Sequence, residues 1–183
     1  MSNTKTVILG ELPKGTIFKI GTREFITFGG ENGGVYAVLK ESAARSQFGA
    51  NNNFAESKIL KQLTEEFLPE IESIVGAENI LEFETDLLSL DGSSQYGVIT
   101  SKISLPTFDF YRKHRATFEK HKLDEWWWLA TPDSTPEWNT KYFVSVVAPS
   151  GRINGDSYSS INGNGVRPFL FFKSSIFVSC DEE

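Results

Sequence analysis

Apolar and polar residues alternate through the first part of the chain with the two-residue period of a β-strand. The segments 16–20, 24–28 and 35–39 carry this pattern, and glycine-containing stretches at 21–22 and 29–34 separate them. The stretch 29–34 lies between two strands and lacks the lysine and hydroxyl residue of a phosphate-binding loop, so it predicts a hairpin turn. We therefore expect a β-meander over residues 1–40.

The apolar period changes to three and four residues between positions 51 and 76, and glutamate and lysine fill the positions between. Asn53 is the predicted N-cap and Gly76 the predicted end of the helical region. Pro69 predicts a break near Leu68, because proline cannot donate the hydrogen bond that continues a helix. Residues 51–76 are therefore expected to be helical but interrupted.

The second half of the chain is predicted to hold mainly strands and turns. Residues 77–125 combine strands at 81–90 and 96–100 with a helix that starts at Ser104 or Leu105 and ends before His121. Strands at 142–147 and 166–172 then flank a hairpin turn at 148–151 and a polar loop at 155–165. Together these patterns predict one α+β domain over residues 1–183.

Two aromatic segments stand out. Residues 125–132 contain three consecutive tryptophans, and residues 165–172 contain Gly-Val-Arg-Pro followed by an apolar run. In an extended segment Trp126 and Trp128 face one way and Trp127 the other. We expect Trp126 and Trp128 to lie in the core, and Trp127, with Trp138 and Tyr158, to form an exposed aromatic platform.

The Trp-Trp-Leu-Ala-Thr-Pro element at 127–132 and the Gly-Val-Arg-Pro element at 165–168 resemble the signature of a domain family of unknown function. That family is common in phages, prophages and Gram-positive bacteria, and it is similar to the C-type-lectin-like and formylglycine-generating-enzyme-like fold group. The resemblance extends from about Tyr36 to Phe172. It implies a C-type-lectin-like fold with a twisted antiparallel sheet, two helices and a long loop-rich C-terminal half. It also implies that the two elements lie side by side.

Charge and cysteine content limit the expected partners and the expected cellular location. A net charge of −6 and a pI of about 5.1 argue against direct binding to nucleic acid, which needs a positive surface. The basic segment 112–122 is either a solvated helix face or a docking patch, and we favour the first. The single thiol, Cys180, allows no internal disulfide, and the apolar triplet at 7–9 is too short for a membrane span. A cytoplasmic location, with no membrane association, is the expectation.

The sequence offers little for catalysis or cofactor binding. Two histidines, His114 and His121, and one thiol are too few for a metal site of useful affinity, and we expect both histidines at the surface. Asp156 is the only carboxylate in the Asn-rich loop, so calcium is not expected. Arg167 is predicted to be a partly buried ion-pair partner, with an anion-binding role as the alternative. Asp124 and Glu125 are expected to cap, or to pair with Arg167 or Lys122.

The sequence therefore predicts recognition without catalysis, cofactor or metal, by a protein that binds another protein or a small ligand. The binding residues are expected on one aromatic and Asn-rich face: Trp127, Trp138, Asn154, Asp156, Tyr158, Asn162, Asn164 and Arg167. The alternative is an anti-defence inhibitor that blocks the nucleic-acid groove of a host nuclease with an acidic helix face: Glu56, Glu65, Glu66, Glu70 and Glu72. The sequence does not predict the oligomeric state.

Overall fold

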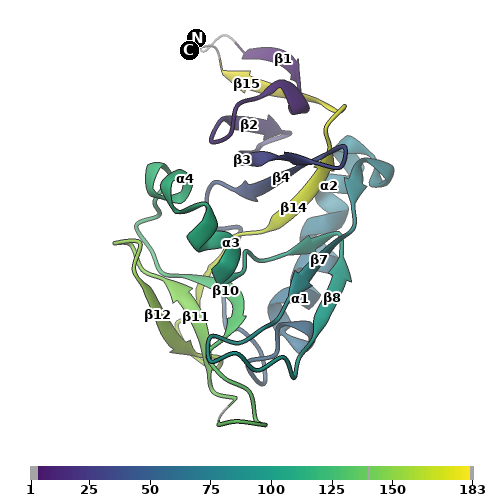
Figure 1. Cartoon of the computed structure of the whole chain (residues 1–183). Coiled ribbons are helices and arrows are strands. Elements are labelled where there is room, and N and C mark those ends of the chain that lie inside the picture. Colours follow the sequence, from purple (N-terminus) through teal and green to yellow (C-terminus); the bar gives the residue numbers. More distant parts are fainter. Residues whose placement is uncertain (1–3, 140, 182–183) are drawn as a thin grey trace.

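A computed structural model describes residues 4–139 and 141–181 as a mixed α and β structure that is mostly sheet (Figure 1). The first sheet is antiparallel throughout, in the order β1-β15-β2-β3-β4-β14-β6, with β9 also paired to β14. Its strands are β1 (Thr4–Ile8), β2 (Ile17–Ile20), β3 (Arg23–Glu31), β4 (Gly34–Leu39), β6 (Ile80–Leu81), β9 (Ile103–Ser104), β14 (Phe169–Lys173) and β15 (Phe177–Asp181). The predicted meander corresponds to β2, β3 and β4.

A second, smaller sheet has the order β12-β11-β10-β13-β5, and its β10–β13 pair is parallel. It contains β5 (Ala44–Ser46), β10 (Trp127–Pro132), β11 (Phe143–Val147), β12 (Ile153–Ser157) and β13 (Asn164–Val166). A separate hairpin joins β7 (Phe83–Asp86) to β8 (Val98–Ser101). The expected single twisted sheet is therefore divided, because the predicted strand 166–172 leaves one sheet at Val166 and enters the other at Phe169.

The long helical segment is interrupted, as its sequence predicts. Asn53 and Ser57 cap its first turns through their side chains, and Gly76 ends it with a φ of 88°. A π-helical turn directly precedes Leu68, at the predicted break. The pieces are η2 (Phe54–Glu56), α1 (Lys58–Gln62), η3 (Leu63–Phe67) and α2 (Leu68–Val75), and the remaining short turns are η1 (Leu9–Glu11) and η4 (Ala77–Asn79).

The second helical region starts later than predicted. Thr107 is the N-cap of α3 (Phe108–Lys113), and α4 (Arg115–Lys120) follows directly. Ser104 belongs to β9 instead, where its hydroxyl accepts a hydrogen bond from Thr85 at 2.9 Å. The predicted inner residues Tyr111 and Phe118 are both buried.

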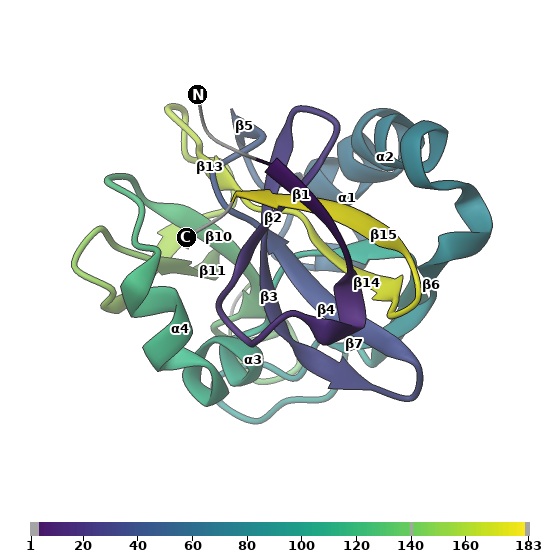
Figure 2. The ribbon, with the colours of Figure 1, turned by 90° about the horizontal axis from the view of Figure 1, so that it is seen from above.

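Helices cover both faces of the first sheet (Figure 2), because its strands carry large apolar residues on both sides. Phe18, Phe25 and Phe172 pack with the residues of α1 and α2, whereas Ile26, Val38 and Phe171 pack with those of α3 and α4. The two clusters cover both faces of the central strands β3, β4 and β14.

Candidate functional site: an aromatic loop end

The two aromatic segments that the sequence singled out lie side by side. Trp127 of β10 is paired with Gly165 of β13, and the Gly165 N–H donates to the Trp126 carbonyl at 2.7 Å. The predicted juxtaposition is therefore confirmed. Gly165 is required at this contact, because a Cβ added there would lie on the Ser42 hydroxyl.

Arg167 lies where the chain passes between the two sheets, and it is only 1% exposed. Its Nε donates to the Leu39 carbonyl and its guanidinium also donates to the Lys40 carbonyl, each at 3.0 Å. The guanidinium stacks over the rings of Trp127 and Phe118, at 4.8 and 5.6 Å from their centroids. Burial lowers the pKa of Arg167 to about 10. We call Phe118, Trp127 and Arg167 the indole–arginine junction.

The expectation that Arg167 is an ion-pair partner is wrong. Among residues 4–139 and 141–181 it forms no ion pair, and two aromatic rings and two carbonyls already use its guanidinium. Glu125 pairs with Arg45 at 3.2 Å, and Lys122 pairs with Glu119 at 2.7 Å. The expected pairing of Glu125 with Arg167 or Lys122 is therefore also wrong. The junction is held by cation–π contacts and charge-assisted hydrogen bonds.

The exposure of the three indoles differs from the prediction. Trp128 is fully buried, as expected, and its N–H donates to the Ser46 carbonyl at 2.8 Å. Trp127 is only 2% exposed, so the expectation that it forms part of an exposed platform is wrong. Trp126 is 36% exposed although it was placed in the core. Alternation predicts correctly that Trp127 opposes Trp128, but α3 and α4 cover that side too.

Exposed aromatic side chains do occur, in and around the loop between β10 and β11. In that loop Trp138 is 59% exposed and Tyr142 55%, and Phe143, the first residue of β11, is 45% exposed. Tyr158 is partly buried and stacks on Tyr142, with ring centroids 6.3 Å apart. We call these four residues the aromatic end. The loop lies at the end of the molecule opposite the chain termini (Figure 1).

A buried asparagine holds this loop in place. Asn52 is inaccessible to solvent, and its Nδ2 donates to the carbonyls of Ser134 at 2.8 Å and Phe143 at 3.0 Å. Its Oδ1 accepts from the Tyr96 hydroxyl at 2.7 Å. These contacts reach the loop 87–97, the loop between β10 and β11, and the first residue of β11. One amide thus connects the residues before α1 to all three. The sequence indicated Asn53 as a cap but gave no signal for Asn52.

Two side chains of the asparagine-rich segment form hydrogen bonds with its own backbone. The Arg152 carbonyl accepts from the Ala148 N–H, and the Tyr158 N–H donates to the Tyr142 carbonyl, so both residues form hydrogen bonds toward β11. Because the bonding direction alternates along a strand, the N–H groups of Gly155 and Ser157 point to the free edge of β12. Asn154 Oδ1 accepts from Gly155 N–H at 3.0 Å, and Asp156 Oδ1 accepts from Ser157 N–H at 2.8 Å. These side chains therefore cover an edge that another strand could otherwise extend.

The other two predicted asparagines, Asn162 and Asn164, differ in exposure. Asn164 is 5% exposed and its Nδ2 donates to Asp156 Oδ2 at 2.7 Å, so it is not available on an open face. Asn162 is exposed in the turn before β13. Of the predicted site residues, Trp138 is exposed in the loop before β11, and Tyr158 stacks on Tyr142. The exposed rings of Tyr142 and Phe143 belong to a segment that the sequence assigned only to a strand.

His114 is only partly exposed. Its ring packs against Phe110 and Phe28, at centroid distances of 4.4 and 5.6 Å, and Lys14 Nζ lies 2.6 Å from Nδ1. Burial, followed by the charges of Lys14 and Lys113, lowers the pKa of His114 to about 4. The other histidine, His121, is partly buried, and its Nε2 lies 3.0 Å from the Gly15 carbonyl.

The basic segment 112–122 is largely paired with its own acidic neighbours. Arg112 pairs with Asp109 at 2.9 Å, and Arg115 pairs with Glu119 at 2.7 Å. In the described part of the chain, no group of three or more His, Cys, Asp or Glu residues is arranged to hold a metal ion. Nor is any helix within residues 4–139 and 141–181 long and apolar enough to span a membrane.

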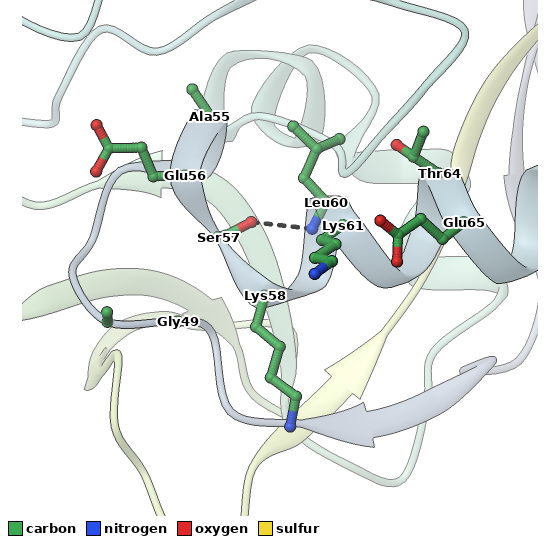
Figure 3. A pocket seen from close by; sticks show the side chains of 10 residues that line it. Gly49, Ala55, Glu56, Ser57, Lys58, Leu60, Lys61, Thr64 and Glu65 are labelled. Carbon is green, nitrogen blue, oxygen red and sulfur yellow. Dashed lines mark hydrogen bonds between the residues drawn. The ribbon is translucent and has the colours of Figure 1, made fainter.

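The acidic helix face is partly neutralised. Glu70 forms a two-point contact with Arg23 at 2.8 and 2.9 Å, and Lys102 donates to Glu72 at 3.0 Å. A cavity of about 710 Å³ runs along α1, and Lys58 and Lys61 line it together with Glu65 (Figure 3). The helical region therefore presents mixed charge around this cavity.

Comparisons of the chain with protein-family models, curated proteins and solved structures gave no match. The geometry alone therefore guides the functional proposal.

Proposed function

We propose that this chain is a non-catalytic binding protein that recognises a protein partner through the aromatic end. The observation that carries the proposal is the exposure of Trp138, Tyr142 and Phe143 together in one loop region. Large aromatic side chains supply much contact area at a small entropic cost, and they are enriched at binding hot spots. The rigid second sheet and the buried Asn52 amide hold this surface in position, which lowers the ordering cost of binding.

We also propose a fold class and a cellular location for this protein. The contact between the indole strand and the Gly-Val-Arg-Pro strand supports the C-type-lectin-like class, since the resemblance implies that adjacency. We further propose a cytoplasmic setting, where the single thiol of Cys180 is compatible with reducing conditions. In this class, binding by loops on a rigid sheet is a common solution.

The acidic helix is less suited to imitate a nucleic acid. Ion pairs with Arg23 and Lys102 offset two of the five glutamates, and Lys58 and Lys61 lie among the others. A mimic of the phosphate backbone needs a row of unpaired negative charges. We therefore do not propose the nuclease-blocking role.

A displayed library of random peptides tests the proposed surface. Peptides selected on the wild-type protein are expected to bind Trp138→Ala and Tyr142→Ala at least about tenfold more weakly, since each change removes an exposed hot-spot ring. The matched control is Phe177→Ala, which removes a ring that is 70% exposed at a site in the first sheet. Equal binding to all three variants would overturn the proposal.

A further inference from the structure

Next to the aromatic end, a carboxylate lies against a glycine of the edge strand. A Cβ added to Gly155 would stand 2.7 Å from Asp133 Oδ2, so the Asp133 side chain occupies the space that any larger residue would fill. Ser145 is the β11 residue paired with Gly155. Because paired residues on adjacent strands face the same side of a sheet, the Ser145 hydroxyl projects on the side of this carboxylate.

Two of these oxygen atoms have unmet hydrogen-bonding capacity. Asp133 Oδ1 and Ser145 Oγ are both buried, and neither has a hydrogen-bond partner among the residues that the structure describes. Ser145 is completely buried. Burial, followed by the nearby charge of Asp91, raises the pKa of Asp133. Buried oxygens of this kind are normally paired, so these two oxygens favour a group that brings N–H donors and positive charge.

The surroundings of these oxygens fit such a group. The Asp133 carbonyl accepts from the Asp91 N–H at 3.2 Å. The exposed Asp91 carboxylate, whose Oδ1 accepts from the Ser89 hydroxyl, is the charge that helps to raise the pKa of Asp133. Phe143 lies two residues from Ser145 on β11, hence on the same face, and is 45% exposed. Within the described ranges, no salt bridge involves Asp91 or Asp133. Two carboxylates beside an aromatic ring are a known way to bind a cationic side chain.

We propose that Asp133, Ser145 and Asp91 form a subsite that binds the charged end of a lysine or arginine side chain of the partner. Phe143 contacts the aliphatic part of that side chain. The inference rests on the proposed function, because it assigns the chemistry of one position in the partner. It requires Gly155, whose missing side chain leaves room for the Asp133 carboxylate.

A titration followed by amide chemical shifts tests the subsite without the natural partner. The probes are the N-acetyl methylamides of arginine and lysine, and the neutral probe is the corresponding citrulline derivative. Saturable shifts at Asp133, Ser145 and Gly155 are expected for at least one charged probe, with binding roughly tenfold weaker for citrulline. The ratio of the dissociation constants of the arginine and lysine probes identifies the preferred cationic group.

The variants Asp133→Asn and Ser145→Ala are expected to weaken that binding about tenfold, whereas Glu84→Gln, an exposed carboxylate on β7, leaves it unchanged. Asp133→Asn is nearly isosteric and removes a buried charge, so it should fold. An absence of saturable shifts in the wild type, or equal binding by Asp133→Asn, would overturn the subsite.

The selected peptides separate this inference from the proposed function. If Trp138→Ala loses peptide binding and Asp133→Asn retains it, the surface stands and the subsite fails. If Trp138→Ala and Tyr142→Ala both retain it, the surface itself fails. If the aromatic variants and Asp133→Asn lose it and Glu84→Gln retains it, both proposals are supported.

Discussion

The indole–arginine junction and the aromatic end lie at opposite ends of the same strand, and they use similar side chains in opposite ways. At the junction, Trp127 is covered by Phe118 and by the Arg167 guanidinium, whose donors bond two carbonyls. At the aromatic end, Trp138 and Phe143 remain largely exposed. The difference shows that a segment rich in aromatic residues has exposed rings only where the chain does not supply its own covering residues.

The largest expected effect comes from breaking the junction. Arg167→Ala removes the cation between Trp127 and Phe118 and leaves the Leu39 and Lys40 carbonyls without their donor. We expect a loss of about 3–5 kcal/mol in the free energy of unfolding, measured by urea denaturation. The control Lys120→Ala, an exposed helix position, should change it by less than about 0.5 kcal/mol. A similar small change for Arg167→Ala would show that the junction is not structural.

The second largest effect on stability is expected from removing the Asn52 amide, which connects the residues before α1 to the loop with Trp138. Asn52→Ala removes the Asn52 partner of the Ser134 carbonyl and of the Tyr96 hydroxyl, whereas the Phe143 carbonyl keeps its bond from the Asp133 N–H. We expect unfolding free energy to fall by about 2–3 kcal/mol and the loop with Trp138 to exchange its amide hydrogens faster. Exposed Asn162→Ala is the matched control and should change neither quantity. An unchanged exchange rate in Asn52→Ala would contradict the anchoring role.

A smaller effect is expected on the pH dependence of the free energy of unfolding. The pKa of His114 is about 4 in the folded protein, below its ordinary value of 6.5, so the unfolded state binds the proton more readily. The stability that neutral His114 contributes is fully present above pH 6.5 and is lost as pH falls through 4. Because the ring is partly exposed, we expect a loss of about 1–2 kcal/mol. Urea denaturation across this range should show a weaker pH dependence for His114→Gln, and parallel curves would contradict the assignment.

The smallest effect on stability is expected at the aromatic end. Trp138→Ala should change the free energy of unfolding by less than about 0.5 kcal/mol, since the ring is exposed and no described hydrogen bond uses its indole N–H. Trp128→Phe, which removes a buried indole and its bond to Ser46, should cost about 1–3 kcal/mol in the same urea experiment. If the two variants were equally destabilised, the contrast between the regions would be lost.

Periodicity predicted the elements better than their assembly. The interrupted helix follows from Asn53, Pro69 and Gly76, whose local effects do not depend on the rest of the fold. The apolar run at 166–172 predicted one strand, because hydrophobicity does not show that Arg167 and Pro168 carry the chain from one sheet to the other. Long-range pairing decides such a transition.

The candidate site was predicted only in part. Trp138 was correctly expected to be exposed, but Trp127 was not, because alternation shows that two indoles face opposite sides without showing what covers each side. Asn154 and Asp156 were selected as binding residues for their composition, whereas their oxygens bond the backbone of their own strand. The unpartnered oxygens of Asp133 and Ser145 have no sequence signature at all, since they depend on the pairing of Ser145 with Gly155.

Hydrogen–deuterium exchange of the wild-type protein, with and without a peptide selected from the displayed library, locates the surface that binds a partner. We predict slower exchange on binding at residues 133–139 and 142–145, and no change at 126–128 or 164–170. Protection confined to the indole–arginine junction or to α1 and α2, with none at the aromatic end, would contradict it.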